Sequence, residues 1–379
     1  MKSYRHTMPS GGHRAFTLVE LLVSLAVLTI LLLINAQVIG QVQATWSASN
    51  ARVSQFREAR TAFDIITRNL SQATLNTFMD YQTNYLATAA STSGTSTGGP
   101  GSYVRKSDLQ FICGKASVLV PAGGGGASLP GHAVFFQAPL GVTENPNYVG
   151  LDRLLCPRGY FVQFSSDEFF KPAFLPSGNL RYRYRLMEYS PPAEKNSIYS
   201  LPKSASGTVS GNWFADAGAK MRKDETATNI STTRPVADNI LMLIISPRRE
   251  PTAAEATAGS KESASGPTSI APSYTYDSTQ IVGATTTATQ GTQNLLPPLV
   301  RVVLVAIDEK SADRLDQQKG TGGTGGGTPP FGDTLNAPFS QAYQLDTEIA
   351  ALVKILSAQN VNYRVFSATV QLRGAKWGI

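Results

Sequence analysis

Histidine and cysteine are rare in this sequence, and their rarity restricts the chemistry available to the chain. Its 379 residues include only 3 histidines and 2 cysteines. His6 and His13 precede the first long apolar segment, which leaves His132 as the one histidine of the remaining chain. Structural zinc sites usually combine four cysteine or histidine ligands. We therefore expect no metal site of that kind.

Motifs for catalysis and for cofactor binding are also scarce. A serine–histidine–aspartate triad would depend on His132, which we instead expect to open a strand after Gly131. The acidic pairs Asp167–Glu168 and Asp308–Glu309 are adjacent residues, and neighbours on a strand point to opposite faces. The glycine-rich runs lack the G-x-x-x-x-G-K-[ST] phosphate loop. We predict a protein without enzymatic activity, metal or cofactor.

The sequence also lacks a block of like charges. Its 33 basic and 26 acidic residues give a net charge of +7 without a Lys/Arg-rich block. The alternating segment Arg181–Tyr189 places Arg181, Arg183 and Arg185 on one face of a strand. Such a face could bind a phosphate backbone, which makes nucleic acid the weaker alternative partner. We favour an ordinary half-exposed strand of an antiparallel sheet.

The two cysteines allow two interpretations. Cys113 and Cys156 form one pair, and in an exported domain such a pair allows a disulfide. Two free, buried thiols are the other interpretation. The sequence does not decide between them.

Apolar residues, by contrast, dominate one long segment, Phe16–Ile34. Its polar residues are Thr17, Glu20, Ser24 and Thr29. No glycine or proline follows Phe16 before Gly40. A membrane-spanning helix needs about 20 mostly apolar residues, so this segment is predicted to span a bilayer. An ionised carboxylate in lipid costs roughly 2.5–3.5 kcal/mol, so we expect Glu20 to have a partner.

Cleavage between Ala15 and Phe16 would supply such a partner. The new α-amino group would be cationic near neutral pH and would lie about one helical turn before Glu20. The Glu20 of a neighbouring helix could be equally near. Pairing across subunits would neutralise both charges and would fix how far one helix slides along the next.

The stretch F-T-L-V-E after a short basic leader resembles the prepilin-type cleavage and methylation motif of type IV pilins, minor pilins and type II secretion pseudopilins. The basic leader residues are Lys2, Arg5 and Arg14. The resemblance implies that a prepilin peptidase cuts before Phe16 and methylates its amine. It also implies that Glu20 supports methylation and assembly. Ala15 replaces the family's usual glycine, and because alanine is closest in size we expect slower cleavage.

The apolar segment has two other interpretations. It could be a secretory signal cut after Val42-Gln43-Ala44, although it exceeds the usual length of about 7–15 residues, or an uncut membrane anchor. We favour the prepilin interpretation. It implies a single-pass inner-membrane protein with a cytoplasmic N-terminus, a periplasmic or extracellular head, and incorporation into a cell-surface filament. Its implied partners are prepilin peptidase, other pilin-like subunits and membrane lipid.

The helix is expected to continue from Gln41 to about Leu75. Apolar residues recur there with a period of about 3.5, at Val42, Trp46, Val53, Phe56, Phe63 and Leu70. Such a stripe normally faces a core. The predicted division of the chain is a leader at 1–15, a helix at 16–80, a flexible linker at 81–102 and a globular head at 103–379.

The head is predicted to be rich in strands. Those expected are Leu109–Cys113, Ser117–Val120, Ala133–Gln137, Tyr160–Phe164, Arg181–Tyr189, Ile240–Ile245, Val300–Ile307 and Arg364–Leu372. Two polar inserts, 250–293 and 313–339, are expected to be mobile loops. Asp346–Gln359 is predicted to be an amphipathic helix capped by Asp346 or Thr347.

Three stretches of the head refine the resemblance. Arg234–Ser246, Leu296–Val305 and Arg364–Arg373 resemble, in that order, strands of the J-type minor pseudopilins and W-type minor pilins. The whole pattern is also similar to the prepilin-like proteins called Verru_Chthon cassette protein C.

The sequence therefore predicts an α+β, type IV pilin-like fold, in which a long N-terminal helix packs on an antiparallel β-sheet head. The predicted function is a structural minor pilin or pseudopilin-like subunit of a type IV pilus or type II secretion filament. One alternative is a subunit that binds DNA or a surface through the three arginines. Another is a stand-alone exported protein that is anchored in the membrane by the prepilin route.

Overall fold

The computed structural model describes residues 17–81, 103–120, 129–167, 180–203, 209–218, 232–251, 253–257, 270–280, 291–318 and 329–376. The chain divides into two compact units, Met1–Ser54 and Gln55–Ile379. The predicted leader 1–15, including Ala15, and the residue Phe16 lie outside the described residues. So do nearly all of the predicted linker and parts of both predicted inserts.

The first unit consists, where described, of the apolar part of helix α1 (Leu18–Ser71). Its stretch Leu18–Ser47 has 30 residues and a mean hydropathy of 2.5, which is long and apolar enough to cross a membrane. The side chains of this stretch are exposed, including Val42 and Trp46, which we expected to face the head. Because both residues belong to the first unit, their predicted contact with the head stays a prediction.

The second part of α1 belongs to the second unit and packs on its core. The buried side chains follow helical spacing: Ala59, Ala62, Phe63, Ile66 and Leu70. Phe63 and Leu70 confirm the later part of the predicted stripe, and the ring of Phe63 lies 6.0 Å from that of Phe366. The helix ends at Ser71 rather than near Leu75. Beyond it, the backbone N–H of Thr74 donates to the carbonyl of Gln137, which draws the chain onto a sheet.

A six-stranded antiparallel sheet forms one layer of the head, in the order β7-β6-β5-β4-β3-β9. Its strands are β3 (Ile112–Lys115), β4 (His132–Pro139), β5 (Leu155–Ser166), β6 (Tyr182–Tyr189), β7 (Thr233–Asp238) and β9 (Tyr276–Asp277). In the register, Val134 pairs with Tyr160 and Val162 with Leu186. A separate hairpin pairs β1 (Phe78–Tyr81) with β2 (Tyr103–Lys106).

A three-stranded antiparallel sheet forms the second layer, in the order β11-β10-β8. Its strands are β8 (Ile240–Arg248), β10 (Leu299–Ile307) and β11 (Tyr363–Gln371). The predicted strand Ile240–Ile245 is confirmed as part of β8. The longer stretch Arg234–Ser246 spans two strands, because the chain leaves the first sheet after β7 and enters the second at β8. Between them Asn239 adopts a φ of 59°, a left-handed conformation that asparagine tolerates better than most residues.

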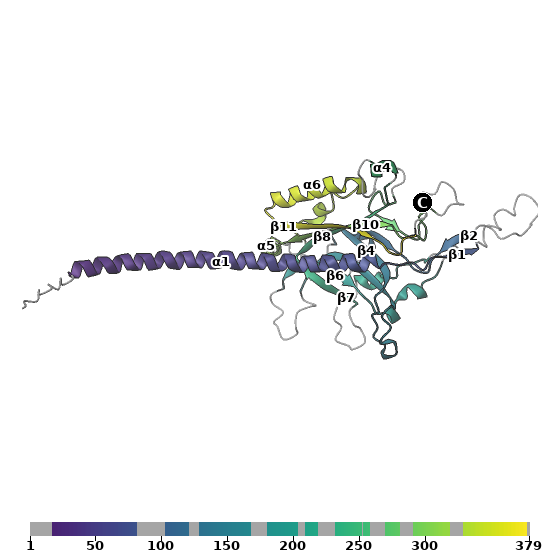
Figure 1. Cartoon of the computed structure of the whole chain (residues 1–379), viewed down its shortest axis with the longest axis horizontal. Coiled ribbons are helices and arrows are strands. Elements are labelled where there is room, and N and C mark those ends of the chain that lie inside the picture. Colours follow the sequence, from purple (N-terminus) through teal and green to yellow (C-terminus); the bar gives the residue numbers. More distant parts are fainter. Residues whose placement is uncertain are drawn as a thin grey trace, which may run out of the picture. The chain divides into compact units, whose positions relative to one another are not determined.

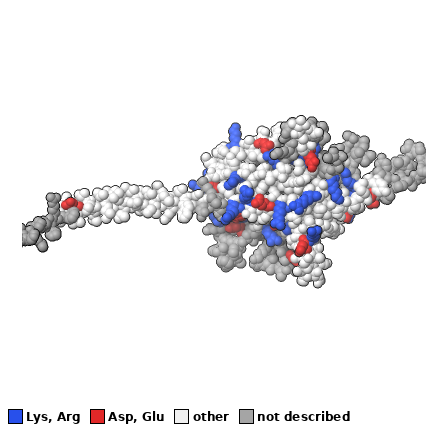
Figure 2. Space-filling model, viewed as in Figure 1, with Lys and Arg blue, Asp and Glu red and all other residues white. Residues whose placement is uncertain are grey.

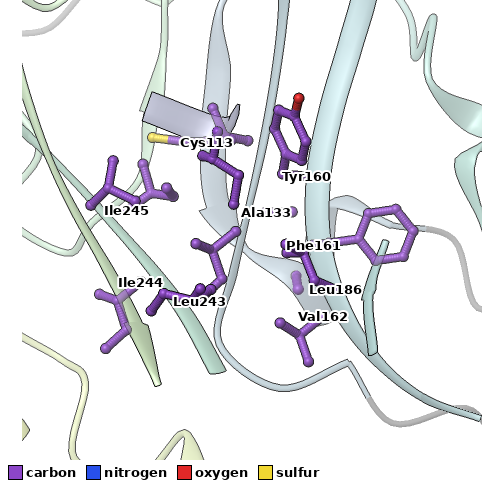
Figure 3. Packing of buried hydrophobic residues seen from close by; sticks show 14 of the residues in the cluster. Cys113, Ala133, Tyr160, Phe161, Val162, Leu186, Leu243, Ile244 and Ile245 are labelled. Carbon is purple, nitrogen blue, oxygen red and sulfur yellow. The ribbon is translucent and has the colours of Figure 1, made fainter. Parts of the chain in front are cut away.

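The core lies between the two sheets. Leu243, Ile244 and Ile245 of β8 belong to one hydrophobic cluster with Ala133 of β4 and Val162 of β5 (Figure 3). All nine residues of β8 are buried, which explains why its sequence is a continuous apolar run rather than an alternating one. The two layers with one shared core confirm the α+β expectation for the head.

Helices cover the remaining faces and ends. They are α3 (Ala116–Leu119), α4 (Ala253–Thr257), α5 (Glu309–Gln318) and α6 (Leu345–Ala358), with short 3-10 helices at Pro146–Tyr148, Ala193–Lys195, Ser197–Ser200, Ala215–Ala217, Gly332–Leu335 and Ala342–Gln344. The position of α3 shows that the predicted strand Ser117–Val120 is wrong.

The predicted helix Asp346–Gln359 is confirmed as α6. Its cap is not, because Gln344 occupies that position without a side-chain hydrogen bond and Asp346 pairs with Arg301 at 2.7 Å.

Candidate functional site: the N-terminal helix

The start of α1 is shaped by Thr17. The backbone N–H of Glu20 donates to both the carbonyl (3.0 Å) and the hydroxyl (3.3 Å) of Thr17. A threonine followed three residues later by a glutamate is the spacing of a helix capping box. Glu20 thereby lies in the first turn, where the helix dipole favours an anion. The sequence interpretation missed this role of Thr17, although the T-x-x-E spacing carried the signal.

Several other polar side chains of the apolar stretch bond to their own helix. Ser24, Thr29 and Asn35 each donate to a backbone carbonyl three or four residues earlier, at 2.9, 2.8 and 3.0 Å. These bonds reduce the cost of placing polar groups in a bilayer. Glu20 differs from them, because it is the only charged side chain between Leu18 and Ser47. The surface of this part of α1 is uncharged apart from the acidic group near its start (Figure 2).

Several predicted site residues cannot be placed beside Glu20. The basic residues Lys2, Arg5 and Arg14 and the cleavage pair Ala15 and Phe16 lie outside the described residues. The pairing of Glu20 with a new amine on Phe16 therefore stays a prediction.

The predicted anion-binding face of the head is wrong. Only 4% of the Arg183 side chain is exposed, and it pairs with Glu309 at 3.1 Å, with Asp316 at 3.7 Å and with Asp313. All three carboxylates lie on α5, a helix that the sequence interpretation did not expect. The guanidinium is therefore already neutralised within the chain.

The other two arginines are engaged as well. Arg185 is buried and lies 3.0 Å from Asp238. Burial lowers the pKa of the Arg185 guanidinium, and Asp238 opposes that shift. Arg181 precedes β6, is mostly exposed and lies 3.3 Å from Asp313. On the face shown in Figure 2, basic and acidic side chains of the head are interspersed. The segment forms strand β6 as predicted, but the strand is buried rather than half-exposed, because only Tyr182 and Glu188 among its residues are partly exposed.

The disulfide that the sequence left open is not formed. Cys113 on β3 and Cys156 on β5 are both free and buried. They flank β4 from opposite sides, paired with Val134 and Ala138 respectively. Two strand spacings alone separate them by about 10 Å, whereas a disulfide needs Cα atoms within about 7 Å. Burial raises the pKa of the Cys113 thiol, which makes it unreactive.

The head contains a pocket of about 330 Å³, and several of its polar lining residues bond to one another or to neighbouring side chains. Gln110 donates to Asp277 at 2.9 Å and accepts from the indole of Trp213 at 3.0 Å. Over the described ranges, no group of three or more histidine, cysteine or acidic side chains is placed to hold a metal ion. The hydroxyl of Thr279, also in this lining, donates to Asp277 at 2.8 Å.

His132 opens β4, as expected, and links the two sheets. The backbone N–H of Ile245 on β8 donates to its Nδ1 at 3.1 Å. The imidazole is buried and lies 4.8 Å from the ring of Tyr274. Burial lowers its pKa from 6.5 to about 4. The ring is therefore neutral in the folded head, in a structural position.

Acid is expected to destabilise the head through His132. Between pH 6.5 and 4 the unfolded chain binds a proton that the folded head does not, so stability falls as the pH falls. The loss should reach about 3 kcal/mol at pH 4 relative to neutral pH. Urea unfolding of the full chain in detergent micelles across this range measures it. His132→Asn, which keeps an acceptor for Ile245, should flatten this part of the profile, and an unchanged profile would contradict the assignment.

Comparison with known proteins identifies one segment. Residues 11–34 match the family model described as the prokaryotic N-terminal methylation motif. No curated protein and no solved structure matches the chain. The matched segment contains Glu20 and the first half of the apolar stretch. The N-terminal segment of this chain is therefore that of a type IV pilin-like, membrane-anchored substrate of prepilin peptidase.

Proposed function

We propose that the chain is a minor pilin or pseudopilin-like structural subunit of a type IV pilus or type II secretion-type filament. Prepilin peptidase removes residues 1–15 and methylates Phe16. The mature subunit waits in the inner membrane, with its N-terminus in the cytoplasm and its head on the other side. It then joins other pilin-like subunits through side-to-side packing of its apolar helix.

One observation carries the proposal: the methylation motif lies at the start of a helix whose apolar side chains remain exposed. From Leu18 to Ile39 the large hydrophobic side chains are half or more exposed. A helix that is apolar all round is stable only in a membrane or packed against other helices. The methylation motif implies that the helix lies first in the membrane and then against the helices of other pilin-like subunits.

The uncharged character of this helix also fits assembly through Glu20. Glu20 is the one ionisable group between Leu18 and Ser47, so its charge requires a partner there. A neighbouring subunit's α-amine supplies the opposite charge at the required end of the helix. The pairing of charges in an apolar bundle then fixes the axial offset between subunits.

Processing gives the direct test. The mature protein purified from membranes should begin with N-methyl-Phe16, as read by N-terminal mass spectrometry of its first peptide. Ala15→Gly, which restores the family's usual residue, should increase the cleaved fraction in a pulse-chase experiment. A mature chain that begins at Thr45, after a conventional signal, would contradict the proposal. Retention of the leader in both proteins would contradict it as well and would indicate an uncut anchor.

A further inference from the structure

The apolar part of α1 carries a heptad-spaced seam along one face. Its positions alternate at intervals of three and four residues: Leu21, Ser24, Leu28, Leu31, Asn35, Val38 and Val42. The alternation gives a mean period of about 3.5 residues, at which one face of a helix stays toward a parallel partner. Glu20 borders this same face.

Asn35 is the exceptional member of the seam. It lies about 26 Å from Leu18 and about 18 Å from Ser47 along the helix, well inside the candidate membrane span. Its Nδ2 donates to the carbonyl of Leu31, and its side chain is exposed. Within the part of the chain that the structure describes, no donor reaches its Oδ1. Placing an amide oxygen in hydrocarbon without a hydrogen-bond donor costs free energy, unless a neighbouring helix supplies that donor.

We propose that Asn35 pairs with Asn35 of a second copy of this chain, so that the seam holds two copies as a parallel helix dimer in the membrane. The inference rests on the membrane anchoring in the proposed function and deepens it by naming a partner. An amide carries both a donor and an acceptor, so it complements an identical amide. Two copies anchored by the same span lie at the same depth, which brings the two Asn35 residues level.

The rest of the seam is suited to the same partner. Leu28 and Leu31 precede Asn35, and Val38 and Val42 follow it, so apolar side chains flank the amide pair on both sides. The small Ser24 lets the two backbones approach near the start of the helix. A single asparagine at such a position fixes both the register and the number of helices in a bundle.

The test compares two amides on opposite faces of one helix. Gln37 lies two residues beyond Asn35, about 160° away around the helix, and so lies off the seam. Sedimentation equilibrium of the full mature chain in density-matched detergent micelles gives the association constant. Asn35→Leu should weaken association about three- to thirty-fold. Asn35→Gln, which keeps the amide, should retain most of it, and Gln37→Leu should leave it unchanged.

Each outcome decides the proposal. Equal association of the wild type and Asn35→Leu overturns it, because the head or the apolar surface alone would then hold the copies together. A wild type that stays monomeric also overturns it, including the case in which it binds only other pilin-like helices. Extraction of cell membranes with alkaline carbonate and sequencing of the mature N-terminus test anchoring and processing separately. A failure of the proposed function is thereby distinguished from a failure of the dimer.

Discussion

Replacing Glu20 with alanine is expected to abolish assembly with other pilin-like subunits while leaving the chain in the membrane. Removing the carboxylate takes away a cost of roughly 2.5–3.5 kcal/mol from the span, so anchoring should be as strong or stronger. It also removes the one charged group of the stretch that can pair with a neighbour. Co-purification with tagged prepilin-motif proteins should fall more than about tenfold, as expected when a buried charge pair loses one member.

Two variants separate the charge from the side chain's size. Glu20→Gln keeps the shape and removes the charge, and we expect it to behave like the alanine variant. Thr29→Ala, at a residue outside the seam, removes only a hydroxyl that bonds to the carbonyl of Ala26. It should assemble as the wild type does. If Glu20→Ala left cleavage, export and co-purification intact, the role assigned to this residue would be wrong.

Replacing Gly131 with alanine is expected to destabilise the head by about 3 kcal/mol or more. Gly131 has a φ of +74°, and a Cβ there would lie 2.4 Å from the carbonyl oxygen of Leu243 on β8. The backbone cannot move away easily. Its N–H donates to Asn336 at 2.7 Å and its carbonyl accepts from Ala116 at 2.9 Å. Strain and a clash between the two sheets therefore add together.

A second glycine isolates the strain from the clash. Gly332 also has a positive φ, +50°, but a Cβ there would meet nothing within 4 Å. Gly332→Ala should cost only about 1–2 kcal/mol, the expense of the left-handed conformation. Urea unfolding of the full chain in micelles, followed through the fluorescence of the buried Trp213, measures both variants. Equal destabilisation by the two would show that the close approach of Gly131 to β8 is unimportant.

The elements that the sequence predicted well are those whose own residues decide their state. The strands β8 and β10 are runs of branched apolar residues, and the helix α6 repeats leucine and isoleucine at helical intervals. Each was predicted within a few residues of its ends. The membrane helix needed even less context, because length and apolar composition alone specify it.

The errors share a different cause, which is contact between distant residues. Arg183 and Arg185 were expected on a half-exposed strand, and an anion-binding face was kept as the alternative, because the carboxylates that hold them lie elsewhere in the sequence. Glu309 is 126 residues from Arg183. The helix α5 is polar along most of its length and was assigned to a mobile insert for that reason. At Asn239 the chain passes from one sheet to the other, and no sequence pattern near this residue indicates that change.

The end of α1 has a mechanical consequence. Asn69 donates to the hydroxyl of Tyr160 at 2.7 Å, Thr74 donates to Gln137 of β4, and Ser71 accepts from Arg373, just beyond β11. These bonds tie the exit of the helix to both sheets at once. A tensile load carried along the helix therefore enters the head at several strands together, and they must yield in concert.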